Sequence, residues 1–262
     1  MSDDAILLEI QPNGVARLTL NRPDVHNAFD DALIAGLSLR LRELDAHHAV
    51  RVVVLAGNGK SFSAGADLNW MKRMARYSEG ENLRDAVGLA DLMHTLSAMS
   101  KPTIARVHGA AYGGGVGLVA CCDIAIGTPG ASFSLSEVRL GLIPAVISPY
   151  VIAAIGERQA RRYFLTAERF DAQEAQRIGL LHRVVAENEL DASVEALIDE
   201  LLKGGPKAQA AAKHLIGSVV NRPIDRRLVE ETAERIARIR VTPEGREGVA
   251  AFLEKRQPGW VK

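Results

Sequence analysis

The sequence predicts an α/β protein with added helices toward its C-terminal end. Segments with the pattern of strands alternate with segments with the pattern of helices up to about residue 185. After Val146 almost every segment has the pattern of a helix, and residues 182–185 are the last strand expected. No long Pro/Ser linker or low-complexity tract interrupts the 262 residues, which are enough to bury a sizeable core.

The N-terminal part has clear local patterns. Alternating apolar residues at 7–10 and 15–20 flank Pro12-Asn13-Gly14, which predicts a β-hairpin. Asp30 and Asp31 are expected to begin an amphipathic helix that ends near His47. Residues 50–56 form a β-branched run that ends at glycines, which predicts a buried strand.

A stretch of small residues follows, Ser-Phe-Ser-Ala-Gly-Ala-Asp-Leu at 61–68. It has no regular period, so it is interpreted as a loop that begins a helix, with Asp67 as the N-cap. Small side chains leave the main chain accessible, so an N–H group aimed at a ligand is the alternative. Residues 69–100 are expected to be helical in two pieces that separate near residues 78–80. Their methionines (Met71, Met74, Met93 and Met99) fit a core, or a flexible apolar pocket.

Residues 103–107 have the pattern of a short buried strand, and Gly113-Gly114-Gly115 then turns the chain into an apolar helix over 116–121. Glycines at such a turn permit positive φ and close approach to the main chain. The first amides of the helix lack intrahelical acceptors and lie at the positive end of its dipole. Tight packing and an oxyanion site both fit this turn. It is neither a dinucleotide-binding fingerprint nor a phosphate-binding P-loop.

Further short strands are expected at 123–126 and 132–135, before a turn over 136–144 that carries Glu137 between apolar neighbours. A buried glutamate with a raised pKa would be a proton shuttle, whereas a surface glutamate paired with Arg139 is the alternative. Helices are predicted at 151–155, 158–165, 172–178, 190–202, 207–220, 225–239 and 244–255.

The composition narrows the function classes. Acidic and basic residues are equal in number, 32 each, which disfavours a nucleic-acid binder driven by overall charge. The start of the chain does not resemble a secretory signal, and no apolar run is long enough to span a membrane. Cys121 and Cys122 lie in an apolar segment and are expected to be small buried hydrophobes rather than metal or redox groups. A cytoplasmic location is the resulting expectation.

Several motifs in order along the chain resemble the crotonase (enoyl-CoA hydratase/isomerase) superfamily. They are Leu20-Asn21-Arg22-Pro23, residues 63–68, residues 109–115 followed by Cys122-Asp123-Ile124, residues 137–144 and residues 167–172. The resemblance covers essentially the whole chain. It implies a spiral of repeated ββα turns over residues 1–200, a C-terminal helical region over residues 201–262 that makes trimers or hexamers, an acyl-CoA thioester substrate, and no metal or redox cofactor.

The resemblance also assigns site residues. Two main-chain N–H groups hold the thioester oxygen in this family, and the matching positions are Ala64 and Gly114. Glu137 matches a glutamate that handles the proton at the α carbon. The positions expected to border coenzyme A or the acyl group are Arg22, Val25, His26, Ala64, Gly65, Ala66, Asp67, Leu68, Gly114 and Gly117.

One position departs from the family pattern. Typical hydratases carry a second glutamate where this chain has Gly117, so a two-glutamate mechanism does not carry over. Residues 113–123, 134–151, 161–170 and 236–240 are most similar to bacterial methylglutaconyl-CoA hydratases. This resemblance implies hydration of a branched, carboxylated enoyl-CoA, as in leucine or isoprenoid breakdown. An enoyl-CoA isomerase, a decarboxylase or dehydratase, and a non-catalytic acyl-CoA or RNA binder are the alternatives.

A carboxylated acyl chain would need a cationic partner, and the residues after the first loop offer candidates. Lys72, Arg73 and Arg76 are those candidates, although a solvated helix face explains them better. His108 and Tyr112 flank the central turn and fit either pocket or packing roles.

Overall fold

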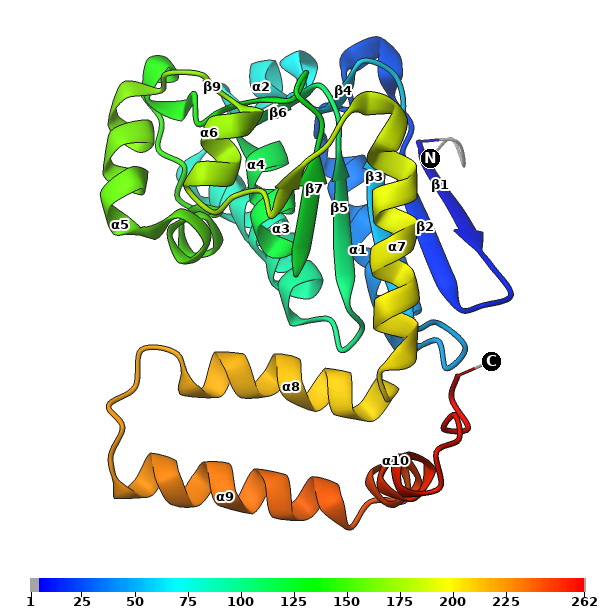
Figure 1. Ribbon diagram of the computed structural model, residues 1–262. Coiled ribbons are helices and arrows are strands. Elements are labelled where there is room, and N and C mark those ends of the chain that lie inside the picture. The colour runs from blue at the N-terminus through cyan, green and yellow to red at the C-terminus, as the bar shows by residue number, and fades with distance from the viewer. Residues whose placement is uncertain (1–4, 262) are drawn as a thin grey trace.

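A large sheet forms the body of the molecule (Figure 1). The computed structural model describes residues 5–261. Within them the sheet has the strand order β1-β2-β3-β5-β7-β10. Its strands are β1 (Ile6–Ile10), β2 (Val15–Leu20), β3 (Val52–Gly57), β5 (Thr103–Val107), β7 (Ile124–Gly127) and β10 (Arg183–Val184). β1 and β2 form the predicted antiparallel hairpin, and the remaining neighbours are parallel.

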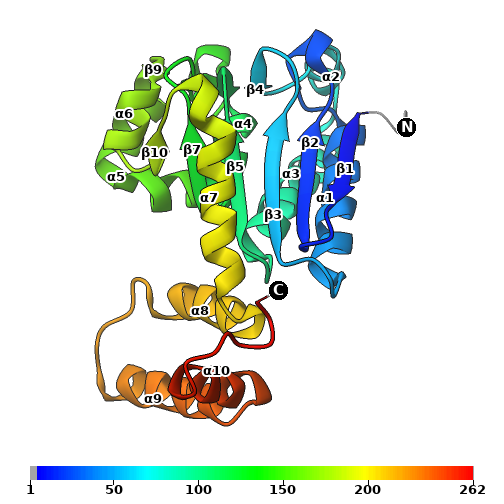
Figure 2. The same cartoon turned by 45° about the vertical axis from the view of Figure 1, so that its right-hand side comes forward.

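Helices cover both faces of this sheet (Figure 2). Helix α7 (Leu190–Lys203) packs on one face, and α1 (Asp31–Ala46) and α3 (Glu79–Ala98) pack on the other. The central strand β3 shows the consequence, because Val52 and Val54 join the cluster under α7 whereas Val53 and Leu55 join the main core. A parallel strand that is buried on both faces therefore has the continuous apolar run that predicted it.

A second, smaller sheet has the order β4-β6-β8-β9. Its strands are β4 (Ser61–Ser63), β6 (Ala110–Tyr112), β8 (Ser132–Ser134) and β9 (Phe170–Asp171). The prediction that residues 61–63 belong to a loop is wrong, because they form a strand. Each of β4, β6 and β8 directly follows a strand of the large sheet and leads into a helical segment, so the ββα spiral is confirmed.

Polar caps set the helix starts in this part of the chain. The Asp30 side chain accepts from the Leu33 amide at the start of α1, and Asp67 caps α2 (Leu68–Met74) as predicted. Ser78 and Glu81 form a capping box that begins α3, so the predicted break near residue 78 is confirmed. The remaining helices of the body are α4 (Gly114–Cys121), α5 (Ser148–Thr166, interrupted by a non-helical Gly156) and α6 (Ala172–Arg177), and the 3-10 helices are η1 (Pro23–Val25), η2 (Glu137–Leu140) and η3 (Glu187–Glu189).

Three C-terminal helices extend from one end of the body (Figure 1). They are α8 (Pro206–Val219), α9 (Arg226–Arg240) and α10 (Pro243–Leu253), close to the predicted ranges. Residue 200 lies inside α7, so the body passes into this region after Lys203. The Lys213 ammonium on α8 binds the Asp123 carboxylate at 2.7 Å and links the region to the sheet.

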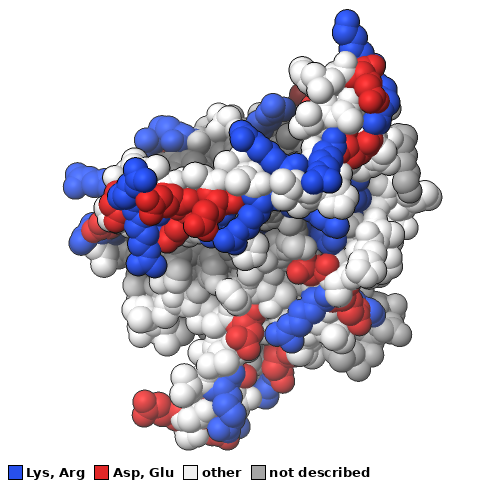
Figure 3. Space-filling model, turned by 90° about the horizontal axis from the view of Figure 1, so that it is seen from below, with Lys and Arg blue, Asp and Glu red and all other residues white. Residues whose placement is uncertain are grey.

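The face of the molecule seen from below carries rows of acidic and basic side chains (Figure 3). On α9 these charges form i,i+4 ion pairs: Arg226–Glu230, Arg227–Glu231 and Arg238–Glu234. No helix within residues 5–261 is long and apolar enough to cross a membrane.

Candidate active site

The motif residues meet at one edge of the small sheet. β4, β6 and β8 are parallel, so their carboxyl ends lie at the same edge. β4 leads into loop 64–67, β6 leads into the Gly113–Gly115 turn, and β8 leads to Glu137. Three segments that are far apart in sequence thus become neighbours.

Close backbone contacts explain the glycines at this edge. A Cβ atom on Gly115 would lie 2.4 Å from the Ser63 carbonyl oxygen, so no side chain fits there. Gly65 has a φ of +92°, and Gly113 has a φ of +49°, both in the region that favours glycine. The tight-packing interpretation of the central turn is therefore confirmed, because Gly115 lets the start of α4 lie against the end of β4.

The structure corrects the assignment of the first amide. The Ala64 N–H already donates to the His26 carbonyl oxygen at 2.9 Å, so it is not free to bind a ligand. Two residues further on, the amide of Ala66 donates to no acceptor within residues 5–261.

The pairing of Ala66 with Phe29 fixes the direction of that free amide. Phe29 N–H donates to the Gly65 carbonyl, and Asp67 N–H donates to the Phe29 carbonyl, both at 2.7 Å. Successive amides of an extended chain point to opposite sides, so the Ala66 N–H points away from Phe29. The sequence signal for this residue is the glycine before it, whose positive φ redirects the chain.

The start of helix α4 supplies the second amide. Gly113 N–H is used in a 2.9 Å bond to the Ser134 carbonyl, and Gly117 N–H makes a bond of the first helical turn, to the Gly113 carbonyl. Gly114 is the first residue of α4, so its N–H has no intrahelical acceptor. The amide lies at the positive end of the helix dipole, which favours a negatively charged oxygen.

Glu137 stands beside this turn. Its Oε1 atom lies 3.2 Å from the position that a Cβ on Gly113 would occupy, and its Oε2 atom is buried with no hydrogen-bond partner in the described structure. Burial raises the pKa of this carboxyl above that of an exposed glutamate. No ion pair to Arg139 forms within residues 5–261, so the surface-pair alternative is wrong.

Gly117 lies one helical turn beyond Gly114 and faces hydrocarbon. A Cβ atom there would be 2.3 Å from Ile147 Cγ2 and 3.1 Å from Met93 Cε. Both of these side chains are buried in the core. The space next to position 117 is therefore filled, and a glutamate would not fit without displacing Ile147.

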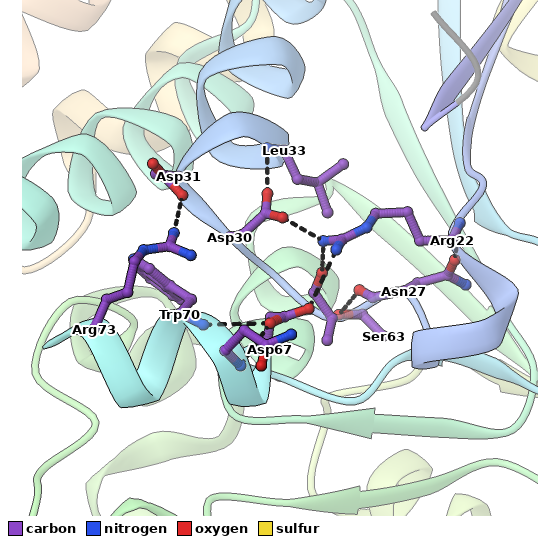
Figure 4. Close-up of polar contacts among 11 residues, drawn as sticks. Arg22, Asn27, Asp30, Asp31, Leu33, Ser63, Asp67, Trp70 and Arg73 are labelled. Carbon is purple, nitrogen blue, oxygen red and sulfur yellow. Dashed lines mark hydrogen bonds and ion pairs between the residues drawn. The ribbon is translucent and has the colours of Figure 1, made fainter. Parts of the chain in front are cut away.

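Arg22 lies in a network of polar contacts beside loop 64–67 (Figure 4). Its guanidinium pairs with Asp30 at 2.9 Å and Asp67 at 3.2 Å, and it donates to the Ala28 carbonyl at 2.8 Å. Burial opposes ionisation of Asp67, but its hydrogen bonds from the Asn69 and Trp70 amides and the charge of Arg22 together lower its pKa. Arg22 therefore ties the chain before α1 to loop 64–67.

The remaining predicted residues differ in their exposure and in their contacts. Val25 and Leu68 are exposed, and His26 is exposed with its Nδ1 atom 3.0 Å from the Ser61 hydroxyl. Arg73 pairs with Asp31 on the surface, which favours the solvated-face interpretation. His108 bonds to the Gly59 carbonyl instead of joining the site.

Tyr112 and the methionines are used mainly in packing. The Tyr112 hydroxyl bonds to Ser132 Oγ, and the guanidinium of Arg169 lies over its ring. Met93 and Met99 are buried core residues, as the core interpretation expects. Within residues 5–261 no group of three or more His, Cys, Asp or Glu side chains is placed to hold a metal ion.

A spiral of ββα turns that brings free amides and a buried carboxyl group to one sheet edge defines the crotonase class of fold. A sequence profile of the enoyl-CoA hydratase/isomerase family matches residues 10–262, and the chain belongs to that family.

Similar proteins of known structure span the whole chain. A crystal structure described as a putative enoyl-CoA hydratase/isomerase from Legionella pneumophila is 48% identical, has a TM-score of 0.93, and covers 99% of this chain and 100% of its own. An enoyl-CoA hydratase structure from Shewanella pealeana is 49% identical with a TM-score of 0.95, covering 98% and 96%. A crotonyl-CoA hydratase from Syntrophomonas wolfei is 32% identical over 100% of this chain and 99% of its own.

Proposed function

We propose that the protein adds water reversibly across the α,β double bond of a branched, carboxylated enoyl-CoA. Family membership supports an enoyl-CoA thioester as the substrate class. The similarity to methylglutaconyl-CoA hydratases noted in the sequence supports the branched, carboxylated acyl group. The reaction is an addition without electron transfer, so the proposal needs no metal or redox cofactor.

The thioester oxygen binds between the amides of Ala66 and Gly114. Negative charge develops on this oxygen when hydroxyl adds to the β carbon, because the product of that step is an enolate. An amide donor placed at such an oxygen stabilises the transition state by about 3 kcal/mol. The dipole of α4 acts in the same direction.

Glu137 carries both proton transfers. Its carboxylate takes a proton from water as the hydroxyl bonds to the β carbon, and the resulting carboxylic acid returns that proton to the α carbon of the enolate. A raised pKa suits both steps, since each form of the group is then accessible near neutral pH. The single observation that carries the proposal is this buried carboxyl beside the Gly113–Gly115 turn.

The apolar surroundings of Gly117 favour one rival. With Ile147 and Met93 where a second carboxylate would stand, position 117 supplies no acid to orient water. Glu137 alone could instead move a proton between the α and γ carbons, which is an enoyl-CoA isomerisation. The two reactions differ in whether solvent oxygen enters the product.

Incubation with methylglutaconyl-CoA in heavy-oxygen water separates them. We expect heavy oxygen in the 3-hydroxy product, and we expect straight-chain crotonyl-CoA to react more slowly. A shifted alkene that carries no label would contradict hydration. Glu137→Gln serves as the matched control, because it should greatly slow label uptake while the acyl-CoA still binds.

The C-terminal helices support an oligomer, and we extend the proposal to a homotrimer or a pair of trimers. Ile224 is 89% exposed and Phe252 is 82% exposed in the single chain. Exposed apolar side chains that gather in one region of a protein mark an interaction surface. Similar side chains recur along α8, α9 and α10, including Ile216, Val229, Ile236, Val249 and Leu253. A neighbouring copy would cover them.

A further inference from the structure

A polar pocket lies where the large sheet passes into the small one, away from the edge that carries Glu137. Its volume is about 510 Å³, and its lining includes Lys60, Arg106, His108, Thr128 and Glu187. Lys60, His108, Thr128 and Glu187 follow the carboxyl ends of β3, β5, β7 and β10, and Arg106 lies within β5 next to its end. This is the edge at which open α/β sheets commonly bind ligands. The three-residue strands of the small sheet, each about 10 Å long, separate this pocket from the edge that carries Glu137.

Two buried polar atoms at this pocket have no hydrogen-bond partner among residues 5–261. They are the Thr128 hydroxyl oxygen and His108 Nδ1, and both belong to residues that line the pocket. Thr128 is only 1% exposed, so solvent does not readily satisfy its hydroxyl. The two residues follow the paired ends of β5 and β7, where Thr128 N–H donates to the Val107 carbonyl. Buried polar atoms without partners are rare, and they indicate a missing ligand group or water.

The hydrogen bond to Gly59 decides what His108 can offer. Its Nε2 atom lies 2.9 Å from the Gly59 carbonyl, which only accepts, so Nε2 carries a hydrogen. In the neutral ring Nδ1 is then an acceptor. In the protonated ring both nitrogens donate, and Nδ1–H becomes a charged donor at the pocket.

The charges around His108 are mixed, with a free cation among them. Lys60 makes no ion pair within residues 5–261. Arg106 pairs with Asp191 on α7. The hydrogen bond from Arg106 lowers the pKa of the Asp191 carboxyl, and the charges of Arg17 and His108 lower it further. Glu187 on η3 is the one acidic side chain in the lining, and its Oε1 atom lies near Gly130.

We propose that this pocket binds a small tetrahedral oxyanion of the phosphate or sulfate type. The Thr128 hydroxyl, the protonated His108 ring and the Lys60 ammonium donate to its oxygens. Binding of the anion is coupled to the uptake of one proton, because His108 must be protonated to donate from Nδ1. The affinity therefore rises as the pH falls, with Lys60 and Arg106 favouring the anion and Glu187 and Asp191 opposing it.

Titration calorimetry with inorganic sulfate tests this, because the charge of sulfate stays constant between about pH 5.5 and about pH 8. We expect binding that tightens toward acid pH. Thr128→Val should weaken it about tenfold, whereas Thr128→Ser keeps the hydroxyl and should bind as the unaltered protein does. Glu187→Gln should tighten it. No heat of binding at millimolar sulfate, or equal binding by Thr128→Val, would overturn the proposal.

Two further arms distinguish this pocket from the substrate site. His108→Gln retains a side-chain amide for the Gly59 carbonyl but lacks Nδ1, so it should lose the pH dependence of sulfate binding. Saturating coenzyme A should leave the sulfate affinity unchanged. Displacement of sulfate by coenzyme A would show that the anion occupies the substrate site, which would contradict a separate pocket.

Discussion

The carboxyl group of Glu137 has one buried oxygen that lacks a hydrogen-bond partner in the described part of the chain. That burial has consequences for both activity and stability. Burial raises its pKa, so in the folded protein it holds its proton to higher pH than in the unfolded chain. Between the unfolded and folded pKa values the native state binds more protons. Its contribution to stability is complete below the unfolded pKa and is lost as pH rises through the folded pKa.

The pH dependence of the reaction should report this group. The hydration step begins from the carboxylate, so we expect kcat/KM to fall as pH decreases through a pKa higher than that of an exposed glutamate. A pH–rate profile measures it. An acidic limb at the ordinary glutamate pKa would show that burial does not raise the pKa of Glu137 in the free enzyme.

Glu137→Gln should lower kcat by about 10²–10⁴-fold, because the amide cannot accept the proton of water. The variant keeps the shape of the side chain, so we expect the Kd of a non-reactive acyl-CoA to change little. At alkaline pH its free energy of unfolding should exceed that of the unaltered protein, since no charge is buried. Steady-state kinetics and urea unfolding check the two expectations, and an undiminished kcat would remove Glu137 from the mechanism.

Gly117→Ala should lower the free energy of unfolding by about 1–3 kcal/mol, because the added methyl would lie 2.3 Å from Ile147 Cγ2. Pairing it with Ile147→Ala removes the atom that it meets. The double variant should therefore lose less stability than the sum of the two single losses, as measured by a double-mutant cycle in urea. Strict additivity would show that the two positions do not compete for space.

At the scale of elements, the ion pairs of Arg22 hold loop 64–67 against the start of α1. We expect Arg22→Gln to cost about 1–2 kcal/mol of stability and to raise KM, since the Ala66 amide is then less well fixed. The effect of this link should fade in acid, because the lowered pKa of Asp67 contributes stability that is lost as pH falls through that value. Arg40→Gln, which loses only a surface pair, is the matched control; equal effects of both variants would contradict the role of Arg22.

The long elements could be predicted because their residues repeat with a regular period. The β1–β2 hairpin, the stripe of α1 and the α2–α3 break were all predicted from such patterns. β4, β6 and β9 have only two or three residues each, too few to show a period, and they form by pairing with distant segments. The sheet edge that holds the site therefore could not be located from local patterns.

The same limit applies to the site. Motif resemblance located loop 64–67, the Gly114 turn and Glu137, but not which amide of the loop is free. That depends on Phe29, which is more than thirty positions away in sequence and takes up one side of the loop. The role of Arg22 was likewise hidden, because Asp30 and Asp67 become its neighbours only in the fold.

At the scale of the whole molecule, the exposed apolar side chains of α8, α9 and α10 should be covered by other copies of the chain. Phe252→Glu together with Ile224→Glu should shift the protein from a trimer or hexamer to smaller species in sedimentation velocity. Val25→Glu, an exposed position on the body, is the control and should leave the assembly intact. A monomeric unaltered protein would contradict the proposed assembly.

The central claim is that the Ala66 and Gly114 amides meet on one thioester oxygen, beside but independent of Glu137. Infrared spectroscopy of a bound, carbonyl-labelled, non-reactive acyl-CoA measures this directly. We expect the carbonyl band to move to lower frequency on binding, because two hydrogen bonds polarise the C=O bond. The shift should persist in Glu137→Gln. A band that stays at its solution frequency in a saturated complex would contradict the claim.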